Sequence, residues 1–592
     1  MHVIATAGHV DHGKSTLVRA LTGMEPDRWA EERRRGMTID LGFAWTGLPS
    51  GATVAFVDVP GHERFVPNML AGVGAVPAAL IVVAADDGWM PQSAEHLAAL
   101  DAVGVRHGLI AVTRSDLADP AAAAELARAE VAATSLGDVE VVAVSGASGD
   151  GLPRLVEALD RLVAALPPPD RDAPVRLWID RAFTIRGSGT VVTGTLGAGR
   201  LRAGDELVTS DGRAVRVRGL QSLGESVPEA GAVARVALNL RGVEPAEVGR
   251  GTALLTPGEF GTVGVVDVRV TGDEVAELPR TATLHVGSAA VTAHIRPIGK
   301  DTARLRLERA LPLRLGDRAL LRDPGQRRLA GGVTVLDVAP PPLRRRGASA
   351  ARAVVLAGMD GRPDQRDEVR RRLLVRRADL RRMGITGDLP PVAGDWLADP
   401  VHWEALRARL ETEVARYARE HPLEPGMPVE ELRRVLSLPD RALVETLIRP
   451  PLVSRGGRVR TGDGGGLPEA DARAVDQVLA DLARAPFAAP EAARLAELGL
   501  GPRQIAAATR AGALLRLGES VVLAPGAVES ATAVLATLPQ PFTLSDARRA
   551  LGTTRRVAVP LLEMLDRAGH TRRQDDDRRV VTGPSQELSA EV

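Results

Sequence analysis

The sequence predicts a multidomain chain: an α/β domain with a mainly parallel sheet, two β-barrel domains, and then a tandem array of winged-helix domains. Three observations predict this order. Residues 2–165 alternate apolar strand-like runs with helix-like segments, residues 174–340 consist of short valine-rich segments divided by glycine turns, and the remaining residues show helical periodicity with an internal repeat. Proline-rich runs at 166–170 and 340–342 mark the two transitions and are typical of linkers.

Composition and charge limit the classes of protein to which this chain can belong. It has 592 residues, equal numbers of basic and acidic residues (75 each) and no cysteine. At roughly 100–200 residues per domain the length predicts several domains, and the missing cysteines exclude disulfides, thiolate catalysis and cysteine-based zinc sites. No run of roughly 18 apolar residues occurs, and the N-terminus lacks the basic segment of a signal peptide. We therefore expect a cytoplasmic, monomeric protein without a membrane segment.

The α/β domain is expected over residues 1–168. Its apolar strand candidates are the runs 3–7, 54–57, 79–83, 109–112 and 139–144. Alanine-rich helical segments lie between the later strands, near 92–103 and 121–134. Continuous apolar strands that alternate with helices are typical of a parallel sheet covered on both faces.

A phosphate-binding loop follows the first strand, because the run Gly8–Ser15 fits the pattern G-x-x-x-x-G-K-[ST]. Backbone N–H groups of such a loop surround phosphates, the helix N-terminus adds positive potential, and Lys14 reaches the β and γ phosphates. Lys14 and Lys300 are the only lysines among 75 basic residues, and a compact ammonium fits between phosphates where a planar guanidinium does not. The residues predicted to contact the nucleotide in this run are Asp11, His12, Gly13, Lys14, Ser15 and Thr16.

Ligands for Mg²⁺ and for the γ-phosphate are expected in the same domain. The Ser15 hydroxyl would ligate Mg²⁺, and Thr38, within the run Arg35–Ile39, is a candidate second hydroxyl ligand. Asp58 follows an apolar strand, where a carboxylate can hold Mg²⁺ through water, and the N–H of Gly61 can bind the γ-phosphate. The sequence thus predicts Mg²⁺ together with a nucleoside triphosphate.

The base is expected to be guanine. Asp116 ends the run Thr113–Asp116, and a carboxylate there can accept both N1–H and N2–H₂ of guanine, which adenine does not offer. Thr113 and Arg114 replace the usual Asn-Lys pair, so Arg114 could lay its aliphatic stem under the base, whereas Thr113 lacks the amide. Ser145 and Gly146 lie where a further guanine loop would fall. We therefore expect GTP as the nucleotide and a P-loop GTPase domain.

Two β-barrels are expected at 173–256 and 257–340. In the helical remainder, Arg433–Leu436 lines up with Arg548–Leu551 at an offset of 115, and Arg510–Gly512 with Arg567–Gly569 at an offset of 57. Each copy has two helices and a basic or β-branched tail, which is the winged-helix plan. The sequence predicts four winged helices, at 345–400, 401–465, 468–526 and 527–588.

Together these motifs resemble translational GTPases of the elongation factor Tu class, above all in the runs Gly8–Thr16 and Asp58–His62. The stretch 179–195 is similar to the second domain of bacterial selenocysteine-specific elongation factors, and the winged-helix repeats match the C-terminal extension of that family. The resemblance implies a GTPase that carries selenocysteinyl-tRNA to the ribosome at a recoded UGA codon, binds an mRNA hairpin near that codon and hydrolyses GTP on the ribosome. It also implies that His62 is catalytic and positions the attacking water.

The resemblance further implies a polar, positively charged pocket for the selenolate in the second domain. The matching positions are Asp180, Arg181 and Arg241. A selenol ionises well below physiological pH, unlike a thiol with a pKa of about 8.5. Arginines can therefore favour selenocysteine over serine or cysteine electrostatically, although an arginine-rich chain also forms many ordinary surface ion pairs.

Contacts with the mRNA hairpin are expected in the last repeat. Arg555 and Arg556 open its second helix, and Arg572 and Arg573 belong to its wing. Arginines at a helix N-terminus beside a basic wing suit the phosphates of an RNA stem and one or two splayed bases. The acidic run 575–577 is expected to cap the wing turn and to repel RNA.

Two other functions remain open at this point. One is a general GTPase that handles ordinary aminoacyl-tRNA or initiator tRNA, against which the C-terminal repeats argue. The other is a GTP-gated winged-helix regulator that binds nucleic acid without catalysis, against which the loop Gly8–Ser15, Thr38 and His62 argue. The presence of winged helices does not by itself distinguish a protein that binds duplex DNA from one that binds an RNA hairpin.

Overall fold

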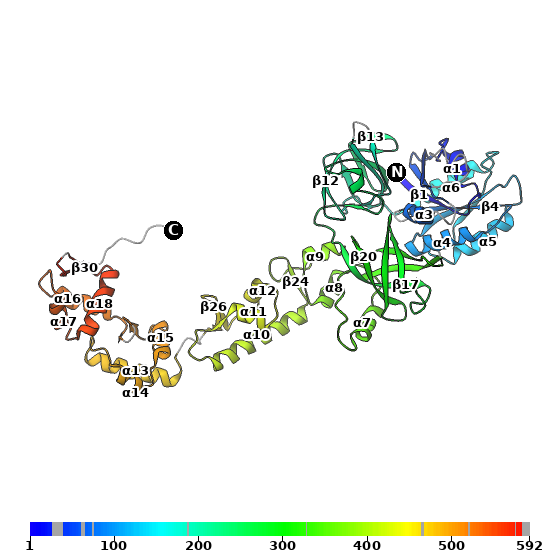
Figure 1. The fold of residues 1–592 in the computed structure, drawn as a ribbon. Helices are drawn as coiled ribbons and strands as arrows, with labels where there is room; N and C mark the ends of the chain where they lie inside the picture. Colours follow the sequence, from blue (N-terminus) through cyan, green and yellow to red (C-terminus); the bar gives the residue numbers. More distant parts are fainter. Residues whose placement is uncertain are drawn as a thin grey trace. The chain divides into compact units, whose positions relative to one another are not determined.

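The computed structural model describes residues 1–26, 40–60, 66–73, 76–185, 189–326, 328–462, 467–518, 521–574 and 576–582. The chain divides into two units (Figure 1), one of residues 1–371 and 375–389, the other of residues 372–374 and 390–592. Among the residues described, no helix is long and apolar enough to cross a membrane.

The first unit begins with the expected α/β domain. Its strands are β1 (His2–Ala7), β2 (Gly42–Gly47), β3 (Thr53–Asp58), β4 (Ala78–Ala84), β5 (His107–Thr113) and β6 (Glu140–Ala143). Its helices are α1 (Lys14–Thr22), α3 (Val66–Val73), α4 (Pro91–Val103), α5 (Ala121–Ala132) and α6 (Leu152–Ala165). The sheet order is β2-β3-β1-β4-β5-β6, and all neighbours are parallel except β2, which is antiparallel to β3. The parallel sheet is confirmed, whereas β2 was not predicted.

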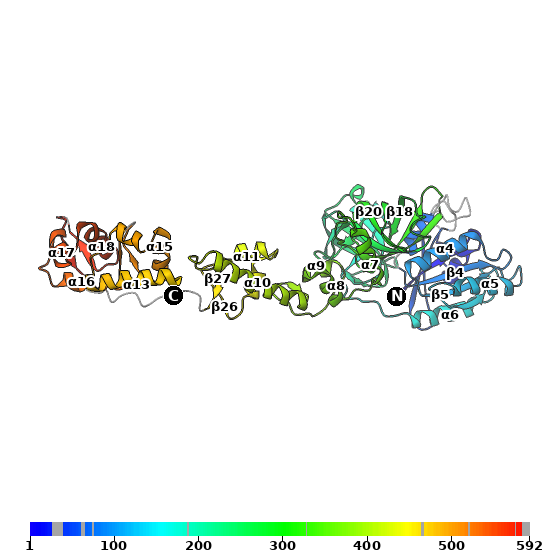
Figure 2. The same cartoon turned by 90° about the horizontal axis from the view of Figure 1, so that it is seen from below.

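Both faces of this sheet are covered, which explains its continuous apolar strands. Ile4, Phe56 and Leu80 pack with α1 and α6 on one face, while alternate residues such as Val57 and Ile81 pack with α4 and α5 on the other. Figure 2 shows α4 and α6 on opposite sides of β4 and β5. The carboxyl ends of β1, β3 and β5 therefore meet at one edge of the sheet, where α/β proteins bind ligands.

The second domain is an antiparallel β structure around one apolar core. Its strands are β7 (Arg176–Trp178), β8 (Arg181–Ile185), β9 (Gly189–Leu196), β10 (Arg200–Arg202), β11 (Glu206–Thr209), β12 (Ala214–Ser222), β13 (Glu225–Val227), β14 (Glu229–Gly231), β15 (Ala234–Arg241) and β16 (Ala253–Leu255). The main sheet runs β7-β16-β11-β12-β15-β9-β8, with β13 beside β12, and β10 pairs with β14. Val215 and Val217 on β12 and Val236 and Leu238 on β15 alternate into the core, as expected for strands with one buried face.

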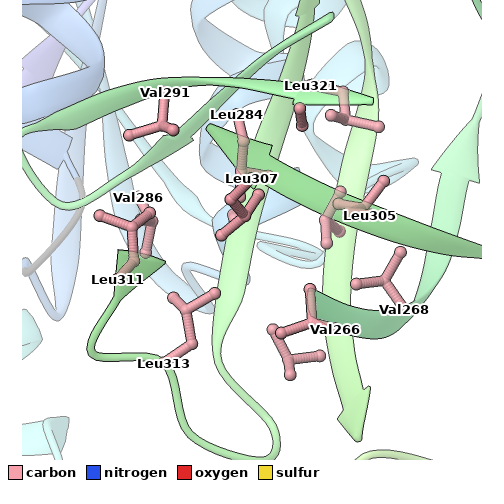
Figure 3. Packing of buried hydrophobic residues seen from close by; sticks show 14 of the residues in the cluster. Val266, Val268, Leu284, Val286, Val291, Leu305, Leu307, Leu311, Leu313 and Leu321 are labelled. Carbon is pink, nitrogen blue, oxygen red and sulfur yellow. The ribbon is translucent and has the colours of Figure 1, made fainter. Parts of the chain in front are cut away.

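The third domain is a closed barrel of six strands in the order β17-β20-β19-β18-β21-β22. These strands are β17 (Val263–Gly272), β18 (Thr281–Val286), β19 (Ala289–Pro297), β20 (Thr302–Leu311), β21 (Arg318–Asp323) and β22 (Arg328–Asp337). Figure 3 shows apolar side chains from several of these strands inside the barrel, including Val266, Leu284 and Leu305. Closure leaves no free edge among these strands, which removes the pairing sites that an open sheet would expose.

A short helical segment follows the barrel: α7 (Ala348–Ala357), α8 (Gln365–Arg372), β23 (Leu374–Arg376), α9 (Arg377–Arg382) and β24 (Trp396–Ala398). Arg352 on α7 is buried and forms ion pairs with Asp267 at 2.7 Å and Asp337 at 2.5 Å, both on the barrel. Removal of one partner would leave a buried charge unpaired, so this network ties α7 to the barrel. The region 345–400, expected to be a winged helix, thus differs from the later repeats because its first helix belongs to the barrel unit.

The described part of the second unit holds three successive groups of helices, each followed by a two-stranded ribbon, to which a third short strand is added in the first group. The first group has α10 (Pro400–Glu420), β25 (Met427–Pro428), α11 (Val429–Val435), α12 (Arg441–Leu447), β26 (Leu452–Arg455) and β27 (Arg458–Thr461). The second has α13 (Glu469–Arg484), α14 (Ala492–Glu497), α15 (Pro502–Arg510), β28 (Leu515–Arg516) and β29 (Val522–Leu523). The third has α16 (Ala527–Ala536), α17 (Leu544–Ala550), α18 (Arg555–Arg567), β30 (Thr571–Arg573) and β31 (Arg579–Val581). Each predicted tail is one of these ribbons, which confirms the winged-helix array.

Candidate nucleotide and cargo sites

The phosphate-binding loop lies between β1 and α1, at the carboxyl edge of the sheet. Gly8 has a φ of 141°, and a Cβ there would lie 2.1 Å from the carbonyl oxygen of Val82. Asp11 and Gly13 also have positive φ, 66° and 77°. This backbone turns the chain tightly into the N-terminus of α1, where unsatisfied N–H groups and the helix dipole attract anions.

Lys14 is held at the centre of this loop. Its side chain is buried, and Nζ donates to the carbonyl oxygens of Gly8 at 3.0 Å and His9 at 2.7 Å. Two of the three ammonium N–H groups are therefore bound to loop carbonyls, and tetrahedral geometry then sets the direction of the third. This arrangement suits a point charge that neutralises phosphate oxygens.

Ser15 and Asp58 come together from α1 and the end of β3. The Ser15 hydroxyl donates to Oδ2 of Asp58 at 2.7 Å, and the Thr6 hydroxyl donates to Oδ1 at 2.7 Å. Thr6 also accepts the N–H of Val59 at 3.1 Å, which fixes the backbone just after Asp58. Hydroxyl and carboxylate oxygens are the hard donors that Mg²⁺ prefers, beside waters and phosphates, so these residues fit a magnesium ion.

The replaced guanine motif has its own bonding pattern. The Thr113 hydroxyl donates to the carbonyl oxygen of His12 at 2.7 Å, so it ties the end of β5 to the phosphate loop. Arg114, with a φ of 55°, donates to Asp86 at 2.8 Å and 3.1 Å and to the carbonyl of Asp11. Thr113 has no amide to offer the base, but through these bonds Thr113 and Arg114 both fix the phosphate loop.

The residues expected to hold the base border the same loop. Asp116 is exposed beyond the end of β5. Ser145 is buried, and its hydroxyl accepts the N–H of Ser148 at 3.0 Å, which shapes the following turn. A Cβ at Gly146 would lie 3.3 Å from the methyl of Thr16, so this turn packs closely on the start of α1. The structure therefore brings the 113–116 and 145–149 segments to the phosphate loop.

Three expected residues lie outside the described residues: Thr38, Gly61 and His62.

A cluster of charged side chains joins the second domain to the first. Arg235 on β15 forms a bidentate ion pair with Asp180, which is buried and also accepts the Thr193 hydroxyl at 2.6 Å. The guanidinium carbon of Arg235 lies 3.8 Å from the ring centroid of Phe43 on β2. A desolvated cation over an aromatic face is attracted by the ring quadrupole, so this edge strand supports the cluster.

Arg181 lies on the same side of the cluster. It forms an ion pair with Asp40 at 2.9 Å, and its guanidinium carbon lies 5.4 Å from the ring centroid of Phe43. Arg250 completes the group, 3.9 Å from Asp40 and 2.6 Å from the amide oxygen of Asn68 on α3. Three arginines (181, 235 and 250) against two aspartates (40 and 180) leave one positive charge in excess, as an anionic ligand requires.

Arg241 does not join this cluster, contrary to the expected grouping. It lies at the other end of β15, opposite Arg216 on β12, and lines a cavity of about 380 Å³ with Thr184 and Arg218. Arg241 follows Arg235 by six positions of extended strand, roughly 20 Å at about 3.3 Å per residue. The structure thus replaces Arg241 with Arg235 as the companion of Asp180.

The arginines expected to bind RNA differ in their partners within the second unit. Arg556 donates to the carbonyl oxygens of Ala489 at 2.9 Å and Pro490 at 3.2 Å, and Arg573 is paired with Asp577 in the wing turn. Asp577 has a φ of 63°, as expected for a residue that caps this turn. Arg555 and Arg572 are exposed and form no ion pair with the described residues, so their charges remain available.

Comparison with known proteins agrees with this architecture. The model of the Elongation factor Tu GTP binding domain matches residues 1–165, and that of the Selenocysteine-specific elongation factor, beta-barrel domain matches residues 266–342. Models described as Elongation factor SelB, winged helix match residues 412–449 and 533–580.

Relatives named Selenocysteine-specific elongation factor align with this chain. That of Escherichia coli (strain K12) is 37% identical over 485 residues, 75% of each chain. That of Desulfomicrobium baculatum is 40% identical over 337 residues, 54% of this chain and 53% of its own. A crystal structure of bacterial selenocysteine-specific elongation factor EF-Sec aligns with a TM-score of 0.73 at 26% identity, over 98% of this chain and 100% of that one.

The chain belongs to the selenocysteine-specific elongation factor family.

As a member of this family the protein is a translational GTPase and binds guanine nucleotide. Within this selenocysteine-specific elongation factor, sequence reasoning missed Arg235 because the strand register that faces it toward Asp180 is not a local property. Alternation alone places Arg235 and Arg241 on one face of β15, and only the pairing with β9 decides which of them lies beside Asp180. Sequence reasoning also missed three side chains of α4 that contact the phosphate loop: Gln92, Ser93 and His96.

Proposed function

We propose that the protein binds selenocysteinyl-tRNA and an mRNA hairpin and delivers selenocysteine to the ribosome at recoded UGA codons, where it hydrolyses GTP. The observation that carries the proposal is the charged cluster of Asp180, Arg181 and Arg235, placed beside the edge strand of the nucleotide-binding sheet. The names of the relatives support the same cargo.

The nucleotide would lie along the carboxyl edge of the sheet. Lys14 and the N–H groups from Asp11 to Thr16 would bind the phosphates, because the loop carbonyls hold the Lys14 ammonium and α1 begins directly after Gly13. Asp116 would accept the guanine N–H groups, with Thr113, Arg114, Ser145 and Gly146 shaping the rim. The exposure of Asp116 leaves its carboxylate accessible to the base.

Hydrolysis requires positioning and charge stabilisation rather than covalent chemistry. Ser15 and Thr38 would ligate Mg²⁺, Asp58 would hold it through water, and the ion would neutralise charge on the phosphates. Gly61 would bind the γ-phosphate, and His62 would orient the attacking water. These roles for Thr38, Gly61 and His62 are supported by the motifs that contain them.

Cargo selection would depend on charge. A selenolate carries a negative charge at neutral pH, whereas a serine hydroxyl is neutral. An excess positive charge in a half-buried cluster stabilises the anion more than it would in water, because the effective dielectric constant is lower. Arg181 and Arg235 therefore favour the selenolate, and Asp180 holds Arg235 in place.

The hairpin would bind at the last winged helix. Arg555 and Arg572 have charges that no described acidic residue neutralises, so they suit RNA phosphates better than the paired Arg573. Arg556 would contribute mainly by fixing the N-terminal end of α18.

The test is a GTP-dependent protection assay in which selenocysteinyl-tRNA is compared with its seryl precursor. We expect protection of the first from hydrolysis at protein concentrations that leave the second unprotected, with GTP and much less with GDP. Equal protection of both tRNAs would contradict the cargo assignment and favour a general aminoacyl-tRNA GTPase.

Two variants separate nucleotide binding from catalysis. Lys14→Ala should abolish GTP binding, and normal GTP affinity in that variant would overturn the phosphate-loop assignment. His62→Ala should bind GTP normally and lose ribosome-stimulated turnover. Unchanged turnover would show that His62 does not position the water.

A further inference from the structure

Helix α4 supports the phosphate loop, although its residues belong to none of the nucleotide-binding motifs. Three successive backbone N–H groups of the loop donate to three side chains of this helix. The bonds are Gly8 N–H to Nδ1 of His96 at 3.1 Å, His9 N–H to Oγ of Ser93 at 3.2 Å, and Val10 N–H to Oε1 of Gln92 at 3.1 Å. Each acceptor thus satisfies one donor of a loop that belongs to no helix or strand.

The three acceptors lie in the first two turns of α4, whose first residue is Pro91. Residues 92, 93 and 96 fall on one side of a helix, since their spacing is one and three residues. Ser93 and His96 are buried, with exposed fractions of 1% and 2%. Because His96 accepts through Nδ1, its proton lies on Nε2. Burial, with the nearby charge of Lys14, lowers the pKa of His96 to about 3, so the ring stays a neutral acceptor.

These bonds divide the loop into two halves. The amides of Gly8, His9 and Val10 are committed to α4, whereas the residues assigned to phosphate binding begin at Asp11. The first half is therefore shaped before a nucleotide arrives, and the second half continues into the N-terminus of α1. A loop that is already ordered loses less conformational entropy when it binds a ligand, so it retains that ligand longer.

The opposite end of α4 rests on the closed barrel of the third domain. A Cβ at Gly332 of β22 would lie 2.9 Å from the Cβ of Ala102, and one at Gly104 would lie 2.9 Å from the Arg318 side chain of β21. Leu320 of β21 joins the apolar core that contains Leu97. The position of α4 is thus set by the barrel as well as by the sheet.

We propose that Gln92, Ser93 and His96 are positioning residues that hold the phosphate loop in its nucleotide-binding shape and thereby set the residence time of GTP and GDP. Because α4 packs on the third domain, docking of that barrel contributes to the shape of the loop. The proposal rests on the GTPase activity and is independent of the cargo.

The test measures dissociation of a fluorescent GDP analogue from the full chain by stopped flow, together with the thermal unfolding midpoint. Ser93→Ala and His96→Leu should each raise the dissociation rate about 10-fold, because each leaves a loop N–H without its acceptor. His96→Asn should stay within about 2-fold of the wild type, since the Asn carbonyl oxygen can replace Nδ1 as acceptor. Gln92→Ala should raise the dissociation rate as well, and because Gln92 is only half-buried, this variant should fold.

Ser135→Ala is the matched control. Ser135 is an exposed serine of the first domain, and its hydroxyl donates to the carbonyl of Val105 at 2.8 Å, away from the loop. This variant also removes one serine hydrogen bond of the domain, but none to the loop, and should leave dissociation unchanged. The proposal is overturned if Ser93→Ala and Gln92→Ala release the GDP analogue at the wild-type rate. It is also overturned if His96→Asn releases the analogue as fast as His96→Leu.

Discussion

Arg181 of the second domain forms an ion pair with Asp40 of the first domain, with 2.9 Å between Nε and Oδ2. The same guanidinium donates to the carbonyl oxygen of Leu41. Asp40 follows Thr38, the proposed Mg²⁺ ligand, by two residues. A residue proposed to bind the cargo is therefore held by Asp40, two positions along the chain from the proposed Mg²⁺ ligand, so we expect changes at Asp40 to affect both proposed sites.

Asp40→Asn should weaken the dependence of cargo binding on GTP. Loss of the competing carboxylate leaves Arg181 with more positive potential, so we expect selenocysteinyl-tRNA to bind the GDP form up to about 5-fold more tightly, the equivalent of about 1 kcal/mol. The measurement is the ratio of tRNA dissociation constants with GDP and GTP. Asp138→Asn, which removes an exposed carboxylate 3.9 Å from Arg128 in the same domain, is the control and should leave the ratio unchanged.

Arg235→Ala should reduce discrimination between selenocysteinyl-tRNA and seryl-tRNA, and Arg241→Ala should not. The first removes a cation from the cluster and leaves buried Asp180 without its ion-pair partner, whereas the second alters a separate cavity. Arg235→Lys keeps the charge and should retain part of the discrimination. Competition binding of the two tRNAs checks this, with the unfolding midpoint as a control for stability. A larger loss in Arg241→Ala would restore the original grouping.

Asp116→Asn should exchange guanine for xanthine as the preferred base. Loss of a charged acceptor for the two guanine N–H groups should weaken GTP binding by at least about 10-fold. An Asn amide can donate to the carbonyl that xanthine carries in place of the guanine amino group, so XTP should bind better than it does to the wild type. Titration with fluorescent GTP and XTP tests the exchange. If both affinities stay at wild-type values, Asp116 does not contact the base.

The protein should lose stability as the pH falls from about 6.5 toward about 4. Burial lowers the pKa of His12 and of His285 to about 4 and that of His96 to about 3, all below the value of 6.5 in the unfolded chain. Lys14 lowers the pKa of His12 and His96 further, and Arg322 and Arg250 lower that of His285. The unfolded chain therefore binds more protons in this window, and the free energy of unfolding falls with pH by at most about 1.4 kcal/mol per unit for each histidine.

Urea unfolding at about pH 7 and about pH 5 measures this dependence. His285→Gln removes one of the three buried imidazoles and should make the loss of stability shallower, without contact to the nucleotide site. An unfolding free energy that rises on acidification would contradict the neutral state of these histidines.

Hairpin binding should depend more on Arg572 than on Arg573, although the two are neighbours on β30. Arg573 is already neutralised by Asp577, so its removal should change affinity little, whereas Arg572→Ala should weaken binding several-fold and lower the salt slope by about 1. Filter binding of an RNA hairpin at several salt concentrations measures both effects. An equal loss in the two variants would show that the Asp577 pair opens on binding.

Much of the nucleotide site could be predicted because its information is local. The run Gly8–Ser15 between an apolar strand and a helix, with Asp58 at a later strand end, specifies a loop and a sheet edge by residue spacing alone. The parallel sheet followed from continuous apolar runs, and the wings followed from β-branched tails at a regular repeat. The edge strand β2 escaped prediction because its residues Gly42–Gly47 show no continuous apolar run.

By itself, the sequence determined that this protein has a phosphate loop, a parallel α/β sheet, β domains and a winged-helix array, since each depends on residues a few positions apart. Only the tertiary structure decided that Arg235 rather than Arg241 joins Asp180, and that α4 supports the phosphate loop. Both depend on which strands pair and which helix faces meet. Such contacts join residues between roughly 50 and 90 positions apart, as Asp180 with Arg235 and Gly8 with His96, and no short-range pattern encodes them.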